Sequence, residues 1–131
     1  QLTLTAWKEA GAAEVGVALK IDTPLAAVDG VASHVDVVQL MSISEIGHQG
    51  KSFDERALAR VEELHANYPE MIVAADGGVT EATVEQLVRA GANELIVGSA
   101  LRHSPEPEAA YARIHERAMR GCAPASPEMS V

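Results

Sequence analysis

At 131 residues the chain has the length of one domain, and 47% of its residues are apolar, which is enough to form a core. Its formal net charge of −9 excludes nucleic acid as an expected partner, because neutralising phosphates requires a basic surface. The single cysteine, Cys122, cannot form an internal disulfide and predicts a reducing cytoplasm, and no apolar run approaches the roughly 20 residues of a membrane helix.

The first part of the chain predicts a helix, a strand and a second helix. The first helix is expected over residues 1–13, and the strand that follows is expected over residues 15–21. Thr23 and Pro24 have the order of an N-cap and a first-turn proline, so they predict a short helix that ends near Ala32.

The middle of the chain predicts a strand, a polar loop and an amphipathic helix. Residues 35–43 are nearly all apolar, so we expect this strand to be buried on both faces. The loop 44–52 follows the strand and contains His48, which is a candidate for contact with a substrate. Asp54 is placed to cap a helix that continues to about Asn67.

The stretch 72–101 predicts one parallel βαβ unit in which a glycine-rich turn follows each strand. Thr80 is expected to cap the helix, and Gly91 is expected to take the left-handed conformation just past its end. The glycines after each strand let backbone N–H groups approach an anion, and Ser99 adds a hydroxyl donor. Barrels of eight parallel strands bind phosphate after their seventh and eighth strands, so these turns predict a phosphate site. Its residues are Gly77, Gly78, Gly98 and Ser99.

The end of the chain predicts a last helix and a tail. The helix is expected from Ser104-Pro105 to Gly121. The side chains expected to face inward are Tyr111, Ile114 and Ala118. Residues 122–131 contain two prolines and little to pack, so we expect a disordered tail after a domain that spans residues 1–121.

The order of one helix and four strand–helix pairs predicts the α/β class, with an all-parallel sheet and right-handed crossovers. Four such pairs are half of a TIM barrel, which usually has about 250 residues. The inner face of a half barrel is open to water, and its outer strands are unpaired edges. We therefore expect a partner, either a missing N-terminal half barrel or a second copy in a homo-oligomer.

Several motifs, by their order and spacing, resemble the C-terminal half of ribulose-phosphate 3-epimerases, which are barrels of the ribulose-phosphate-binding type. The resemblance extends from about Ala6 to Leu101. The motifs are Gly16-Val17-Ala18-Leu19, Thr23-Pro24, Met41-Ser42-Ile43, Lys51 with Phe53, Asp76-Gly77-Gly78 and Gly98-Ser99-Ala100. The resemblance implies strands five to eight of a TIM barrel and epimerisation at C3 of a phosphorylated ketopentose, a step of the pentose phosphate pathway.

The resemblance also implies the chemistry of the site. Family members use two aspartates on opposite faces of the substrate and a divalent metal ion, such as zinc, which two histidines and those aspartates hold. Asp76 matches the later aspartate and is therefore implied as a catalytic residue and metal ligand. The other three ligands belong to strands that this chain does not contain, so we predict that the chain alone is inactive. Without the resemblance, Asp76 could equally cap the next helix or order the glycine turn.

Two segments depart from the family pattern. Residues 44–50 replace the glycine-rich loop that covers the substrate, and Lys20-Ile21-Asp22 stands where the family has Asn-Pro-Gly. Three functions therefore stay open: an epimerase, a non-catalytic phosphosugar-binding or scaffold protein, and another phosphate-binding barrel enzyme. The last two require no metal at Asp76. In each of them a phosphorylated sugar or metabolite is the expected partner, and Arg102 is placed to supplement its phosphate site.

Overall fold

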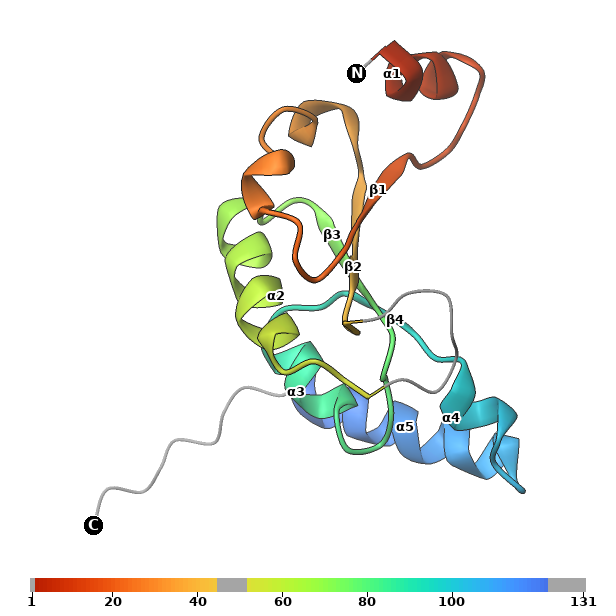
Figure 1. Cartoon of the computed structure of the whole chain (residues 1–131). Coiled ribbons are helices and arrows are strands. Elements are labelled where there is room, and N and C mark those ends of the chain that lie inside the picture. Colours follow the sequence, from red (N-terminus) through yellow and green to blue (C-terminus); the bar gives the residue numbers. More distant parts are fainter. Residues whose placement is uncertain (1, 45–51, 123–131) are drawn as a thin grey trace.

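A computed structural model of the chain describes residues 2–44 and 52–122, and it forms an α/β fold with one parallel sheet. The sheet order is β1-β2-β3-β4, the same as the chain order (Figure 1). This confirms the predicted fold class. The elements are α1 (Leu2–Glu9), β1 (Gly16–Leu19), the 3₁₀ helices η1 (Leu25–Ala27) and η2 (Ala32–His34), β2 (Val37–Met41), α2 (Arg56–Asn67), β3 (Ile72–Asp76), α3 (Val84–Arg89), β4 (Glu94–Ile96), α4 (Ser99–Arg102) and α5 (Pro107–Cys122).

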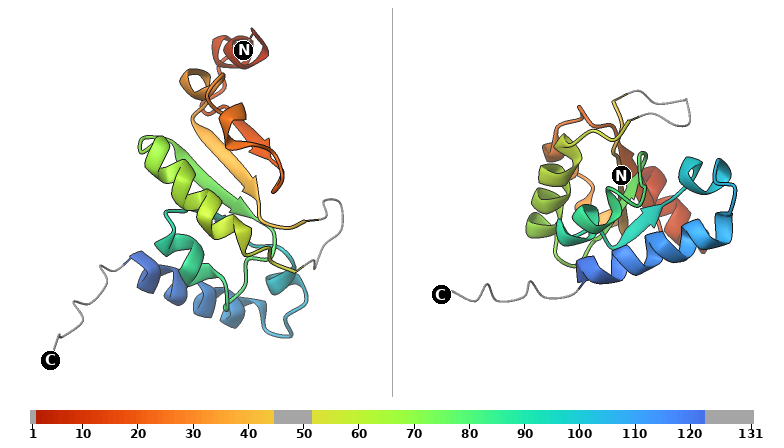
Figure 2. Two further views of the ribbon diagram at one scale, coloured as in Figure 1. Left: turned by 60° about the vertical axis from the view of Figure 1, so that its left-hand side comes forward. Right: turned by 90° about the horizontal axis from the view of Figure 1, so that it is seen from below.

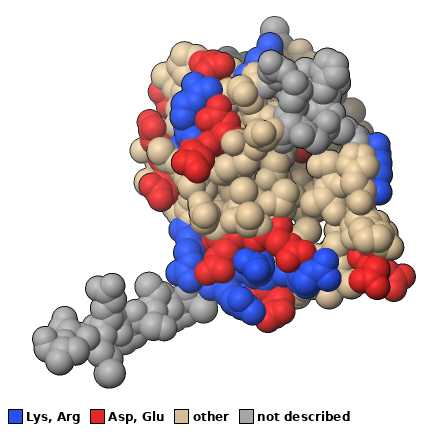
Figure 3. All heavy atoms as spheres, turned by 60° about the horizontal axis from the view of Figure 1, so that its bottom comes forward, with Lys and Arg blue, Asp and Glu red and all other residues tan. Residues whose placement is uncertain are grey.

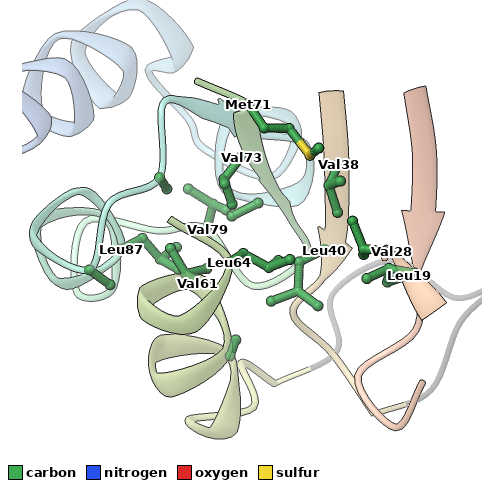
Figure 4. Packing of buried hydrophobic residues seen from close by; sticks show 14 of the residues in the cluster. Leu19, Val28, Val38, Leu40, Val61, Leu64, Met71, Val73, Val79 and Leu87 are labelled. Atoms are coloured by element: carbon green, nitrogen blue, oxygen red, sulfur yellow. The ribbon is translucent and has the colours of Figure 1, made fainter. Parts of the chain in front are cut away.

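The helices α2, α3 and α5 lie along one side of the sheet, as Figures 1 and 2 both show. Successive side chains of a strand point to opposite faces, so each strand sends every second residue toward these helices. Leu19, Leu40 and Ala75 are paired across the sheet on this covered face, and all three are buried. Figure 4 shows this core, in which Val61 and Leu64 of α2 reach the strands.

The opposite face of the sheet, named here the open face, carries no helix within the described part of the chain. Its residues are Gly16, Ala18, Val37, Gln39, Met41, Ile72, Ala74, Asp76, Glu94 and Ile96. Only Ala74 of this set is buried, and Ile96 is 41% exposed. The prediction that residues 35–43 are buried on both faces is therefore wrong, because the described residues cover β2 on one face only.

The segment 24–32 is not the short helix that the sequence predicts. It contains the separate 3₁₀ turns η1 and η2, and Pro24 rather than Thr23 stands at the N-cap of η1 without a side-chain cap. The carbonyl of Thr23 instead accepts a hydrogen bond from Arg60 of α2. Gly30 interrupts the segment, and glycine disfavours a continuous helix.

Helix α5 confirms the last helix expected from Ser104-Pro105 to Gly121, whereas the short α4 before it was not predicted. The short α4 follows β4 directly, and α5 extends one residue beyond Gly121 to Cys122. Ile114 is buried as predicted, but Tyr111 is 59% exposed and stacks on His115, with 6.0 Å between the ring centroids. Tyr111 was expected inside because it is three residues before Ile114, but Ala110, four residues before, takes the buried position. The rest of the predicted tail lies outside the described residues.

Helix α5 packs closely on α3 and forms an ion pair with the segment just before it. A Cβ added to Gly121 would lie 2.8 Å from Val88 Cβ, so this glycine permits the close approach. Arg113 of α5 pairs with Glu81 at 2.7 Å, ahead of α3. Figure 3, in which the lower side of Figure 1 faces the viewer, shows basic and acidic side chains interleaved in this region. Within residues 2–44 and 52–122, no helix combines the length and apolar character that crossing a membrane requires.

Candidate active site

Asp76 is the last residue of β3 and lies on the open face. It is paired with Met41 of β2 and with Ile96 of β4, so the carboxylate stands at the carboxyl end of the two central strands. The residue is half-buried, which leaves part of the carboxylate accessible. In barrels of parallel strands, polar side chains at this end are the ones that take part in catalysis.

Gln39 of β2 contacts the Asp76 carboxylate. Its Nε2 donates a hydrogen bond to Asp76 Oδ2 at 2.7 Å, a length typical of a strong bond to an anion. Gln39 is directly paired with Ala74, which precedes Asp76 by two residues on the same face. Sequence reasoning missed Gln39, although it is the one amide in an apolar strand, and that was the available signal.

Ser42 fixes the chain just after β2 to the turn that follows Asp76. Its side chain is buried, and its Oγ donates a hydrogen bond to the carbonyl oxygen of Gly77 at 2.6 Å. Its backbone N–H donates to the Asp76 carbonyl at 2.7 Å, and its own carbonyl accepts from Asp54 N–H at 2.9 Å. The sequence singled out Ser42 only as part of a motif, and the structure gives it a positioning role.

The turn Gly77-Gly78 requires glycine at both positions. Both residues have positive φ, 109° and 65°, which side chains disfavour. A Cβ on Gly77 would lie 2.8 Å from a methyl carbon of Ile43, and one on Gly78 would lie 2.7 Å from Phe53 Cα. Ile43 and Phe53 form an isolated antiparallel bridge, so the turn packs against the two ends of the loop 44–52.

The turn at Gly98-Ser99 differs from its neighbour. Gly98 has a φ of −113° and a ψ of −83°, and no atom of the described residues outside its immediate chain neighbours lies within 4 Å of a Cβ built there. The described residues therefore leave space for a side chain at this position. Ser99 opens α4, whose first backbone N–H groups have no partner within the helix. Because Asp76 pairs with Ile96, this turn and Gly77-Gly78 follow adjacent strands.

The structure thus brings five of the residues predicted for the site to the carboxyl ends of β3 and β4. They are Asp76, Gly77, Gly78, Gly98 and Ser99.

Arg102 is the last residue of α4 and is exposed. His48 lies outside the described residues, so its predicted contact stays a prediction. Thr80 was expected to cap α3, and its Oγ1 does accept a hydrogen bond from Ala82 N–H, although Thr83 occupies the N-cap position.

The described residues do not by themselves fit a divalent metal ion. No group of three His, Cys, Asp or Glu side chains lies close enough to hold one in residues 2–44 and 52–122. Asp76 offers a single carboxylate, and one of its oxygens already accepts the Gln39 hydrogen bond. A divalent cation prefers several oxygen or nitrogen ligands. Any further ligands must therefore come from outside the described residues.

Arg56 links the start of α2 to the chain after β1, at the same end of the sheet. Its Nη2 lies 2.7 Å from Asp54 Oδ2 and its Nη1 lies 2.7 Å from Asp22 Oδ1. The hydrogen bonds from Arg56 hold the pKa of Asp54 below its ordinary value. The Lys20-Ile21-Asp22 segment, which departs from the family pattern, is thus tied to α2 by an ion pair.

Comparison with known proteins shows which family this chain is similar to. The family model described as "Ribulose-phosphate 3 epimerase family" matches residues 1–102. The ribulose-phosphate 3-epimerase of Schizosaccharomyces pombe is 35% identical over 106 residues, covering 81% of this chain and 46% of that protein. The chloroplastic ribulose-5-phosphate-3-epimerase of Arabidopsis thaliana is 39% identical over 93 residues, covering 68% and 33%. The chain therefore spans less than half the length of these two relatives.

A solved structure agrees on the fold. One chain of the Amycolatopsis orientalis BexX/CysO complex superposes with a TM-score of 0.69. The match covers 98% of this chain and 53% of that chain, at 20% sequence identity. At this identity the likeness concerns the fold alone, and it agrees with a parallel sheet that is part of a larger barrel.

Proposed function

The chain belongs to the ribulose-phosphate 3-epimerase family, and from this we propose that it supplies the phosphate site and one catalytic carboxylate of an isomerase. The substrate class is a phosphorylated ketose, and the reaction is proton transfer at C3. The observation that carries the proposal is the position of Asp76. This carboxylate lies on the open face at the end of β3, beside two glycine turns that follow adjacent strands.

The proposed roles follow from these positions. The backbone N–H groups of Gly77, Gly78 and Ser99, with the Ser99 hydroxyl, bind the substrate phosphate. This anchor leaves the carbon chain of the sugar over the open face, within reach of Asp76. Gln39 occupies Oδ2 of that carboxylate, so Oδ1 takes the C3 proton or returns it. Holding the substrate at two points makes the proton transfer effectively intramolecular.

We further propose that a second half barrel completes the site. Epimerisation needs a second acid–base group on the opposite face of the substrate, and Asp76 can serve only one face. The metal ion implied for the family also needs ligands beyond Asp76. A covering half barrel would supply both and would bury the half-exposed apolar residues Val37, Met41 and Ile72. The domain of residues 1–121 is therefore proposed as one half of a phosphate-binding barrel.

Light scattering and a hydrophobic dye test this need for a partner. The open face exposes apolar side chains, and each one left in water forgoes up to about 1.5–3 kcal/mol of burial. We expect the isolated chain to self-associate at low micromolar concentration or to bind the dye, and we expect a complementary half barrel to suppress both. A stable monomer that binds no dye contradicts this proposal.

One observation favours a second candidate, a protein that binds phosphosugars without catalysis. The described part of the chain presents the glycine turns in full but only one of the carboxylates that the chemistry needs. Another phosphate-binding barrel enzyme is the third candidate, because such turns occur on this fold with many activities. These candidates retain phosphate binding and lose epimerisation, so an experiment that measures both separates them.

The experiment combines phosphate binding and turnover. In the chain alone, inorganic phosphate is expected to shift the amide resonances of the four predicted phosphate-site residues, with no turnover of ribulose 5-phosphate. In the barrel completed by a half that supplies strands one to four, Asp76→Asn should lower turnover by about a hundredfold or more. Glu94→Gln is the matched control, because Glu94 is an exposed carboxylate on the same face and should leave turnover unchanged.

The possible results distinguish the candidates. Phosphate binding without turnover in the completed barrel favours the non-catalytic candidate. Absence of any shift at the glycine turns rejects the phosphate site. Turnover by the chain alone that disappears in Asp76→Asn means that this half carries a complete site, contrary to our proposal.

A further inference from the structure

Among the described residues, Gln39 is the only one whose side chain donates a hydrogen bond to the Asp76 carboxylate. It extends from the middle of β2, where its neighbours across the sheet on the open face are Ala18 and Ala74. Both neighbours end in a methyl group, so neither fills the space over the strands. The longer glutamine side chain therefore crosses to the next pair of residues, where Asp76 stands at the end of β3.

A role in folding alone does not account for this arrangement. Gln39 is half-buried on a face that no helix covers in the described part of the chain, so its amide does not need a protein partner. The other contact of Nε2 is with Met41 Sδ at 3.5 Å, and a thioether is a weak acceptor. The one strong partner of the amide is thus the carboxylate proposed as the acid–base group.

We propose that Gln39 is a positioning residue, which holds the Asp76 carboxylate so that one oxygen faces the substrate. The inference rests on the proposed function of Asp76. An amide N–H restrains Oδ2 through a directional bond, and Oδ1 has no donor among the described residues. A glutamine is neutral, so it orients the carboxylate without the charge compensation that an arginine or lysine would bring. Gln39 thereby favours the orientation of the carboxylate in which Oδ1 can reach C3 of the substrate.

The contact itself is tested by NMR on the chain as it stands. The side-chain amide protons of Gln39 should move when Asp76 is replaced by Asn, because the acceptor changes from an anion to a neutral amide. Val37→Ala is the matched control, since Val37 is on the same face of β2 and should leave these resonances in place. Gln39 resonances that do not respond to Asp76→Asn would overturn the inference whether or not the protein is an epimerase.

The kinetic role is tested in the completed barrel with Gln39→Met, which keeps the length of the side chain and removes the donor. We expect kcat for ribulose 5-phosphate to fall about ten- to a hundredfold, the range of one hydrogen bond to a charged group. KM should stay within about twofold, because the phosphate turns are untouched. A kcat within about twofold of the unsubstituted protein would overturn the positioning role. If Asp76→Asn itself retains turnover, the proposed function fails, and the NMR result alone decides whether Gln39 holds this carboxylate.

Discussion

The two ends of the sheet differ in how many polar groups they leave available to a ligand. At the amino ends, polar side chains satisfy the backbone. Asp36, just before β2, accepts hydrogen bonds from Lys8 Nζ at 2.7 Å and from Val15 N–H at 2.9 Å. Asn93, just before β4, accepts a hydrogen bond from Val73 N–H at 2.8 Å and donates its own N–H to the Val73 carbonyl. Each of these side chains ties one strand to its neighbour.

At the carboxyl ends, polar groups stay available at the surface. Among the described residues, Asp76 keeps one oxygen without a donor, and no atom beyond the chain neighbours of Gly98 lies within 4 Å of a Cβ built there. Both ends thus carry stabilising contacts, such as those of Ser42 and Arg56 at the carboxyl ends, but only the carboxyl ends carry the candidate site, as in parallel barrels. Substitutions at the two ends should therefore separate stability from binding.

The largest expected effect on stability comes from the glycine turns, because Gly78 has a positive φ and close neighbours, whereas Gly98 has neither among the described residues. Gly78→Ala should lower the free energy of unfolding by about 2–4 kcal/mol, from left-handed strain and from overlap with the Phe53 backbone. Gly98→Ala is the control and should change it by less than about 0.5 kcal/mol. Urea unfolding followed by circular dichroism measures both. Equal losses would mean that Gly98 also serves the fold.

Much of this fold was predictable from sequence because the deciding signals are local. Residues 72–101 alternate a buried strand, a glycine turn and an amphipathic helix, and Gly91 has the predicted positive φ of 108°. Asp54 was expected to cap α2, and its carboxylate does accept a hydrogen bond from Arg56 N–H, although Glu55 occupies the N-cap position. Parallel order and the position of Asp76 then follow from the alternation of strands and helices.

The incorrect predictions concern features that depend on contacts between parts of the chain that are distant in sequence. Residues 35–43 look buried on both faces because nearly all of them are apolar, whereas the described residues cover only one face of β2. The helix predicted at 24–32 yields to contacts with α2, which the local sequence does not reveal. Gln39 was missed for the same reason, since its role depends on a register between β2 and β3 that places it diagonally from Asp76.

At the amino end, Asn93→Ala should destabilise the chain by about 1–2 kcal/mol without affecting phosphate binding. The substitution removes the acceptor for Val73 N–H, and Val73 is fully buried. Urea unfolding measures the loss, and a phosphate titration monitors the distant site. Glu94→Ala is the neighbouring control and should stay within about 0.5 kcal/mol, since Glu94 is exposed. A loss of phosphate affinity in Asn93→Ala would contradict the separation of the two ends.

The smallest effect is expected from Asp36, where pH gives the sharpest test. The hydrogen bond from Lys8, with that from Val15 N–H, lowers the pKa of Asp36 below its ordinary value of 3.8. A lowered folded-state pKa adds stability that is fully present above the unfolded-state pKa and is lost as the pH falls through the folded-state value. Asp36→Asn should therefore be less stable than the unsubstituted chain at neutral pH, and the difference should shrink on acidification below about pH 4.

Asp54 complicates this measurement, because Arg56 lowers its pKa as well and its contribution disappears in the same acidic range. The difference in unfolding free energy between the two proteins cancels Asp54, which is unchanged in both, and so isolates Asp36. The carboxylate is partly exposed and its cation is at the surface, so added salt should also reduce the difference. If the difference in unfolding free energy persists unchanged in acid, the stabilisation by Asp36 does not depend on its charge. The protonated Asp36 would then keep a contact that asparagine cannot make.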